Sequence, residues 1–257
     1  MAKPTFKTKL LVLNKTKLGE SDLIISALAE DGSLIKAVAK GARKPSNSFA
    51  ARLDLFSVSD CLLAQGKNLS VFSEARCLIP YLSLRSDIDK NAVASPILEA
   101  LLKTSHEDLQ VPRLFDMSVT ALSSLESSPV ESCPVYTAAF LLKLVAMLGF
   151  RPSFTQCIAC GELINLTQIQ GGVAFSYPDG GLICEDCRTG FETTVIDAAL
   201  LAWAQVLLFS PFSELEQFDI NHDLLFSLLQ FCQTYLRENL SVNLKSLHYL
   251  FSCGLFM

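Results

Sequence analysis

The sequence lacks the common motifs of nucleotide hydrolysis and of nucleophilic catalysis. It contains no G-x-x-x-x-G-K-[ST] phosphate loop, no G-x-G-x-x-G turn and no G-x-S-x-G elbow, which excludes the usual glycine-loop sites for ATP and dinucleotides. Histidine is scarce, and each of the three residues, His106, His222 and His248, stands alone in the sequence. We therefore predict a binding protein and not an enzyme.

Long uncharged apolar runs are also missing. Residues 138–150 contain Lys143, and the run over residues 198–209 is only 12 residues long, whereas a membrane helix needs about 20. The first four residues do not form the apolar run of a signal peptide. The nine cysteines are odd in number, which argues against a disulfide framework. We expect a cytoplasmic protein with no membrane segment.

Four of the cysteines form two C-x2-C pairs separated by 23 residues: Cys157 with Cys160, and Cys184 with Cys187. A C-x2-C turn directs two thiolates at one point, and two such turns can enclose Zn²⁺ in a tetrahedron. A catalytic zinc would use three protein ligands and keep an open position, and four separate core cysteines would have no reason to recur at this spacing. The spacing predicts a structural zinc.

Charge is unevenly distributed along the chain. Residues 1–80 hold 12 Lys and Arg and 7 Asp and Glu, a net charge of +5, whereas residues 81–257 hold 9 and 19, a net charge of −10. Four basic residues cluster on one predicted strand and the loop after it: Lys36, Lys40, Arg43 and Lys44. Such clusters neutralise phosphates with little dependence on base sequence. We predict that a polyanion binds there, the alternative being ordinary solvated lysines.

The first third of the chain has the pattern of a small β-barrel. Short strand-like runs joined by turns are predicted over residues 6–13, 23–29, 34–40, 56–63 and 69–77. Residues 14–22 are expected to be a polar loop, and residues 41–48 a flexible basic segment. Five strands fit an OB-fold, although the count alone does not separate it from an SH3-like barrel. Its phenylalanines, such as Phe56 and Phe72, could stack on bases or fill the core.

After residue 80 the pattern becomes helical. Helices are predicted over residues 95–103, 111–125, 135–149, 195–209 and 222–237. The 195–209 helix is apolar nearly all round, so we expect it to be central and buried. The prediction is an α+β multidomain protein with a barrel at residues 1–80, a helical domain at 81–150 and 191–257, and a cysteine module at 151–190.

Several local features occur in an order typical of one bacterial family. They are Leu13, Gly19-Glu20-Ser21-Asp22, Glu30-Asp31-Gly32, the segment Ala39-Lys40-Gly41-Ala42-Arg43-Lys44, Leu69 after Gly66, Leu148-Gly149-Phe150 and the two cysteine pairs. With the order barrel, helices, cysteine module and helices, which covers essentially the whole chain, the sequence resembles the RecO family of recombination mediators.

The resemblance implies an N-terminal OB-fold, an α-helical domain and a four-cysteine zinc finger. RecO proteins bind single- and double-stranded DNA and anneal complementary strands. With RecR, and in some settings RecF, they help load RecA onto DNA coated by single-stranded DNA-binding protein, whose C-terminal tail they grip. Carried over to this chain, Lys40, Arg43 and Lys44 contact phosphates, the four paired cysteines hold zinc, and the protein works at the nucleoid.

Two other functions are compatible with parts of the sequence. A zinc-containing adaptor could use the acidic helical body to dock basic partners, with DNA contact incidental; it would bind partners without annealing DNA. A zinc hydrolase would need an open metal position and a general base, and the sequence offers neither. The mediator is the function that the residues and the resemblance favour together.

Overall fold

The computed structural model describes residues 4–45 and 47–252; Lys3 and Cys253 lie outside this part of the chain. The chain divides into two compact units, residues 1–127 and residues 128–257. Each unit contains its own sheet and its own helices. The three-domain division at residues 80, 150 and 190 stays a prediction.

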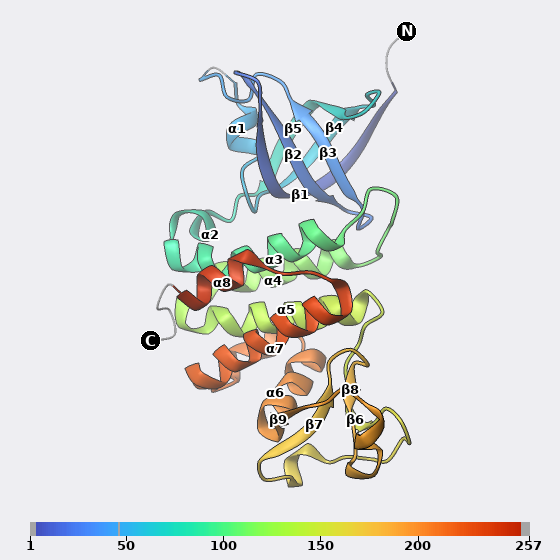
Figure 1. Cartoon of the computed structure of the whole chain (residues 1–257). Helices are drawn as coiled ribbons and strands as arrows, with labels where there is room; N and C mark the ends of the chain where they lie inside the picture. Colours follow the sequence, from blue (N-terminus) through green and yellow to red (C-terminus); the bar gives the residue numbers. More distant parts are fainter. Residues whose placement is uncertain (1–3, 46, 253–257) are drawn as a thin grey trace. The chain divides into compact units, whose positions relative to one another are not determined.

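Residues 5–79 form a closed five-stranded barrel (Figure 1). Its strands are β1 (Thr5–Leu18), β2 (Asp22–Ala29), β3 (Leu34–Ala39), β4 (Val58–Ala64) and β5 (Ser70–Ile79). The order around the barrel is β1-β2-β3-β5-β4, with β1 paired to both β2 and β4 and with β3 parallel to β5. A short helix, α1 (Phe49–Arg52), stands between β3 and β4. This five-stranded Greek-key connectivity is that of an OB-fold, so the predicted fold is confirmed.

The first strand is longer than predicted, because residues 14–18 belong to β1 and not to a loop. Lys15 pairs with Ile25 and Lys17 with Leu23, after a shift of register at Val12 and Asn14. Polar side chains are compatible with this strand because its outer side faces solvent. The barrel phenylalanines divide between two roles. Phe56 and Phe72 are buried in the core, whereas Phe6 is 39% exposed.

Three helices follow the barrel within residues 1–127: α2 (Leu82–Ser86), α3 (Ile88–Thr104) and α4 (Leu114–Ser127). Helix α3 begins seven residues before the predicted start, because the Asp87 side chain caps it by accepting from the N–H groups of Asp89 and Lys90. The Glu126 carboxylate of α4 accepts from the N–H groups of Ser83 and Leu84 in α2, at 3.0 Å each. These contacts join α2 and α4.

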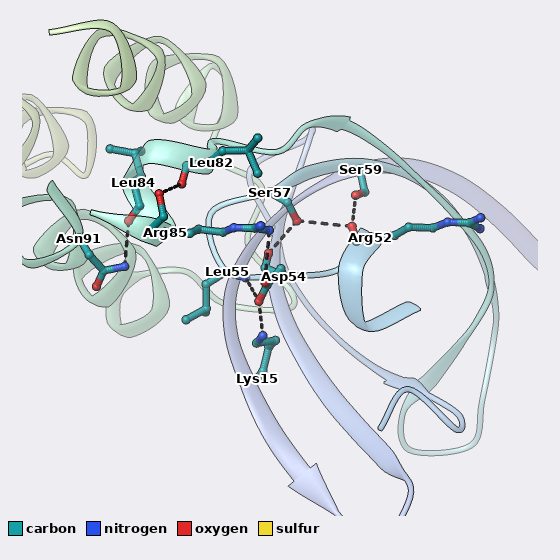
Figure 2. A network of polar contacts seen from close by, with 11 residues as sticks. Lys15, Arg52, Asp54, Leu55, Ser57, Ser59, Leu82, Leu84, Arg85 and Asn91 are labelled. Atoms are coloured by element: carbon teal, nitrogen blue, oxygen red, sulfur yellow. Dashed lines mark hydrogen bonds and ion pairs between the residues drawn. The ribbon is translucent and has the colours of Figure 1, made fainter. Parts of the chain in front are cut away.

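An ionic network joins the barrel to α2 (Figure 2). The Asp54 carboxylate accepts from Lys15 Nζ of β1 and lies 3.2 Å from Arg85 Nη1 of α2. The three side chains are 25–31% exposed. Burial acts to raise the pKa of Asp54, but Lys15, the N–H of Leu55 and Arg85 together outweigh it and lower that pKa below its ordinary value.

In residues 128–257 the helices are α5 (Cys133–Met147), α6 (Ala198–Phe209), α7 (His222–Leu240) and α8 (Lys245–Ser252). Helix α5 is the central one, with 12 of its 15 residues buried. The segment Val130–Met147 is long and apolar enough to cross a membrane by length and hydropathy, but its position as a core helix, 67% buried, accounts for that composition. Helix α6 was predicted to be central and buried, and this is wrong: only five of its 12 residues are buried, and Phe209 is 63% exposed.

The cysteine module is built on a four-stranded sheet. Its strands β6 (Ser153–Cys157), β7 (Gly172–Ser176), β8 (Gly181–Leu182) and β9 (Thr194–Asp197) lie in the order β6-β8-β7-β9. Aromatic rings connect this sheet to α7: Phe175 lies 5.4 Å from Phe231, and Phe154 lies 6.1 Å from it, between ring centroids. The module therefore shares a core with the helix that follows it much later in the chain.

Candidate nucleic-acid interface and metal site

The basic loop between β3 and α1 is held against the turn between β1 and β2. Asp22 Oδ1 accepts from the N–H of Gly41 at 2.7 Å, and the N–H of Arg43 donates to the carbonyl of Ser21 at 2.9 Å. Arg43 Nη1 donates to the carbonyl oxygens of Gly19 and Glu20, at 3.2 and 2.9 Å. A loop expected to be flexible is thus tied to its neighbour through backbone and side chain.

Three of the four predicted DNA contacts lie together in this loop. Lys40, Arg43 and Lys44 are exposed within five consecutive residues. Lys36 is exposed on β3, and its Nζ lies 3.4 Å from a carboxylate oxygen of Glu107. The structure therefore brings together Lys40, Arg43 and Lys44, and gives Lys36 a counter-ion on the surface.

A groove that the sequence did not indicate begins where the loop ends. It has a volume of about 890 Å³ and lies between α1 and the strands β4 and β5. Its basic side chains are Lys7, Arg52 and Arg76, and its acidic ones are Asp60 and Glu74. These residues come from four separate segments. Only the pairing of strands, which sets Asp60 opposite Arg76 and Leu62 opposite both Lys7 and Glu74, brings them together.

The four paired cysteines converge on one point. Cys157 ends β6, Cys160 lies in the following turn, and Cys184 and Cys187 stand at the start of a 3-10 helix, Glu185–Gly190. All four sulfur atoms lie within 4.8 Å of one another, and Cys160 Sγ is 3.6 Å from Cys184 Sγ. Four sulfurs around a tetrahedral zinc, each at 2.3 Å, would be about 3.8 Å apart. The cluster can hold a metal ion, and its donor set fits zinc.

Close packing of the two turns depends on glycine. A Cβ at Gly181 would lie 2.4 Å from Ile158 Cγ2 and 2.9 Å from Ser153 Cβ. Burial acts to raise the pKa of the Cys157 thiol, but the N–H groups of Cys184, Cys160 and Ala159 outweigh it and lower that pKa to about 6. The pKa values of the Cys184 and Cys187 thiols are raised instead, so the thiolate, which is the ligand form, is favoured at Cys157 and opposed at these two.

The fold and the sites define an OB-fold protein that carries a basic loop on its barrel and, in its helical part, a cluster of four cysteines that can hold a metal ion. Comparison with known protein families identifies the family to which it belongs. Residues 1–81 match the family described as "Recombination protein O N terminal", and residues 85–248 match "Recombination protein O C terminal". The chain belongs to the RecO family of DNA repair and recombination proteins.

Curated relatives with the same description cover most of the chain. It is 30% identical to the "DNA repair protein RecO" of Dehalococcoides mccartyi strain BAV1 over 99% of both chains. It is 32% identical to that of Dehalococcoides mccartyi strain 195 over 80% of both chains. The protein of the same description from Cutibacterium acnes is 33% identical over 72% of this chain and 75% of its own.

Proposed function

We propose that the chain is a DNA-binding recombination mediator. It binds single- and double-stranded DNA, anneals complementary single strands, and with RecR helps load RecA onto DNA coated by single-stranded DNA-binding protein, whose C-terminal tail it grips. RecF takes part in some settings, and the protein works in the cytoplasm at the nucleoid. The observation that carries the DNA-binding part is the exposed, tethered loop with Lys40, Arg43 and Lys44 on an OB barrel.

The proposed mechanism is electrostatic and not enzymatic. Lys40, Arg43 and Lys44, with Lys36 beside them in the chain, neutralise phosphates, so that two strands approach with less mutual repulsion. Bases stay accessible for pairing because the contacts are to the backbone. Zinc held by Cys157, Cys160, Cys184 and Cys187 stabilises its module.

The test is annealing of two complementary oligonucleotides coated with single-stranded DNA-binding protein, without nucleotide. We expect the wild type to accelerate annealing and the effect to fade with added salt. The triple variant Lys40→Ala, Arg43→Ala, Lys44→Ala should bind a single strand more weakly, and its salt slope should fall by about 2, since each phosphate contact contributes roughly 0.7.

A matched control removes three positive charges elsewhere: Lys67→Ala, Lys103→Ala and Arg237→Ala. These side chains belong to three different segments outside the loop. If both triple variants lose DNA binding equally, the loop is not the site and net charge alone acts. No annealing and no DNA binding by the wild type at low salt would favour the adaptor, and partner capture would then be the next measurement.

A further inference from the structure

A carboxylate lies beside the proposed phosphate-binding loop and contacts it. Asp22 opens β2, and Lys40 and Lys44 act on it electrostatically from the loop. A negative charge there should repel DNA, because like charges at a binding surface oppose association. If the loop binds DNA, Asp22 must also favour binding in some other way that offsets this repulsion.

The hydrogen bonds that Asp22 accepts provide such a favourable effect, because they fix the turn in the loop. Its Oδ1 accepts from the N–H of Gly41 at 2.7 Å and from Ser21 Oγ at 2.8 Å. Gly41 has φ +64°, a left-handed conformation at which the loop turns away from β3. Lys40 precedes this turn, and Lys44 follows it with its N–H donating to the Gly41 carbonyl at 2.9 Å. Gly41 is thus the point where the directions of both lysines are determined.

Other hydrogen bonds hold the same loop from both sides. Arg43 reaches the carbonyl oxygens of Gly19 and Glu20, on the side of Asp22. On the other side, Asn47 Nδ2 donates to the Lys40 carbonyl at 2.9 Å, and Asn47 Oδ1 accepts from the N–H of Phe49 at 2.8 Å. These bonds hold the two ends of the loop, and the Asp22 carboxylate holds its turn by accepting from the N–H of Gly41.

We propose that Asp22 is a positioning residue for DNA binding: by holding the N–H of Gly41 it presets Lys40 and Lys44, and this gain exceeds the repulsion of its own charge. The inference rests on the proposed function. A loop already ordered before binding avoids the entropy cost of ordering it on DNA. Asp22 itself contacts no phosphate.

A matched pair of substitutions separates the hydrogen bond from the charge. Asp22→Asn and Asp22→Ala remove the same charge, but the asparagine oxygen can still accept from Gly41. If charge alone acts, both variants bind a fluorescent single strand more tightly than wild type and equally well. We expect Asp22→Asn to bind at least as tightly as wild type, and Asp22→Ala to bind more weakly than wild type and about fivefold more weakly than Asp22→Asn.

Two further measurements make the result specific. Glu20→Gln removes an exposed carboxylate from the same turn and leaves the Glu20 carbonyl in place, so it should only tighten binding. The salt slopes of the two Asp22 variants should be equal, because both keep the same cations. Equal affinities of Asp22→Asn and Asp22→Ala would overturn the inference.

Hydrogen exchange of the 40–45 segment, followed by mass spectrometry without DNA, tests the tether independently. Exchange should be faster in Asp22→Ala than in Asp22→Asn at equal global stability, and equal exchange would also overturn the inference. If exchange differs but wild-type protein binds no DNA, the proposed function fails and the positioning role fails with it. If wild type binds DNA and the two variants do not differ, only the role of Asp22 fails.

Discussion

At the scale of single residues, Asp54 is the point through which the barrel holds α2. It receives charges from two elements, Lys15 on β1 and Arg85 on α2. Arg85 Nε is buried and has no hydrogen-bond partner among the described residues. Removing Asp54 would leave two partly buried cations without their counter-ion. The resulting loss of stability exceeds the net stabilisation that the ion pairs provide, because the remaining charges stay partly buried.

We predict that Asp54→Asn lowers the free energy of unfolding at neutral pH by about 1–3 kcal/mol, measured by urea denaturation. The pKa of Asp54 is lowered in the folded state, so its contribution is fully present above the unfolded pKa of about 3.9 and is lost as the pH falls through the folded pKa. The difference between wild type and Asp54→Asn should therefore shrink in acid. Glu20→Gln serves as the control, and a difference that grew on acidification would contradict the assignment.

At the scale of elements, the groove between α1 and the β4–β5 pair continues the proposed DNA path. The loop that carries Lys40 and Lys44 runs directly into α1, and Asn47 hydrogen-bonds both to the loop and to Phe49 of α1. Arg52 Nη1 donates to the Ala75 carbonyl at 3.2 Å, which fixes α1 against β5. The groove thus adjoins the loop and is connected to it through α1.

Opposite substitutions on β5 test this path. Arg76→Gln should weaken single-strand binding and lower the salt slope by about 0.7, whereas Glu74→Gln should tighten binding, because one removes a phosphate partner and the other a repulsive charge. Affinity is measured by fluorescence anisotropy over a salt series. If neither change alters affinity while the Lys40, Arg43, Lys44 variant does, the strand does not enter the groove.

Elements with a strong periodic or spacing signal could be predicted from the sequence. Short strand-like runs joined by turns indicated the strands of the barrel, and the two C-x2-C pairs indicated the cysteine cluster, which the sulfur–sulfur distances confirm, all within 4.8 Å. The early start of α3 was missed because the signal was one capping residue, Asp87. The exposure of α6 was missed because an all-apolar helix does not reveal which side the fold leaves open.

At the scale of the whole molecule, the basic loop and the cysteine cluster belong to different units. Residues 1–127 hold 16 Lys and Arg and 14 Asp and Glu, whereas residues 128–257 hold 5 and 12. The basic loop lies in the first unit and the thiolate cluster in the second. The cysteine module and α7 share an aromatic core, so a metal held by the four cysteines would stabilise the second unit, while the barrel has its own closed sheet and core.

We therefore predict that loss of the metal destabilises the second unit and leaves DNA binding by the loop nearly unchanged. Cys184→Ser should purify with little zinc and lose at least about 3 kcal/mol of unfolding free energy, because metal binding and folding are coupled. Its affinity for a short single strand should stay within about twofold of wild type, because the loop keeps all of its contacts to phosphate.

Three measurements test this prediction. Metal analysis gives the zinc content, denaturation followed by the fluorescence of Trp203 in α6 gives the free energy of unfolding, and fluorescence anisotropy gives the affinity for DNA. Asp186→Asn, which alters the same module without removing a thiolate, should match wild type in all three. A wild type free of metal, with unchanged stability in Cys184→Ser, would refute the structural zinc, and a parallel loss of DNA affinity would refute the independence of the loop.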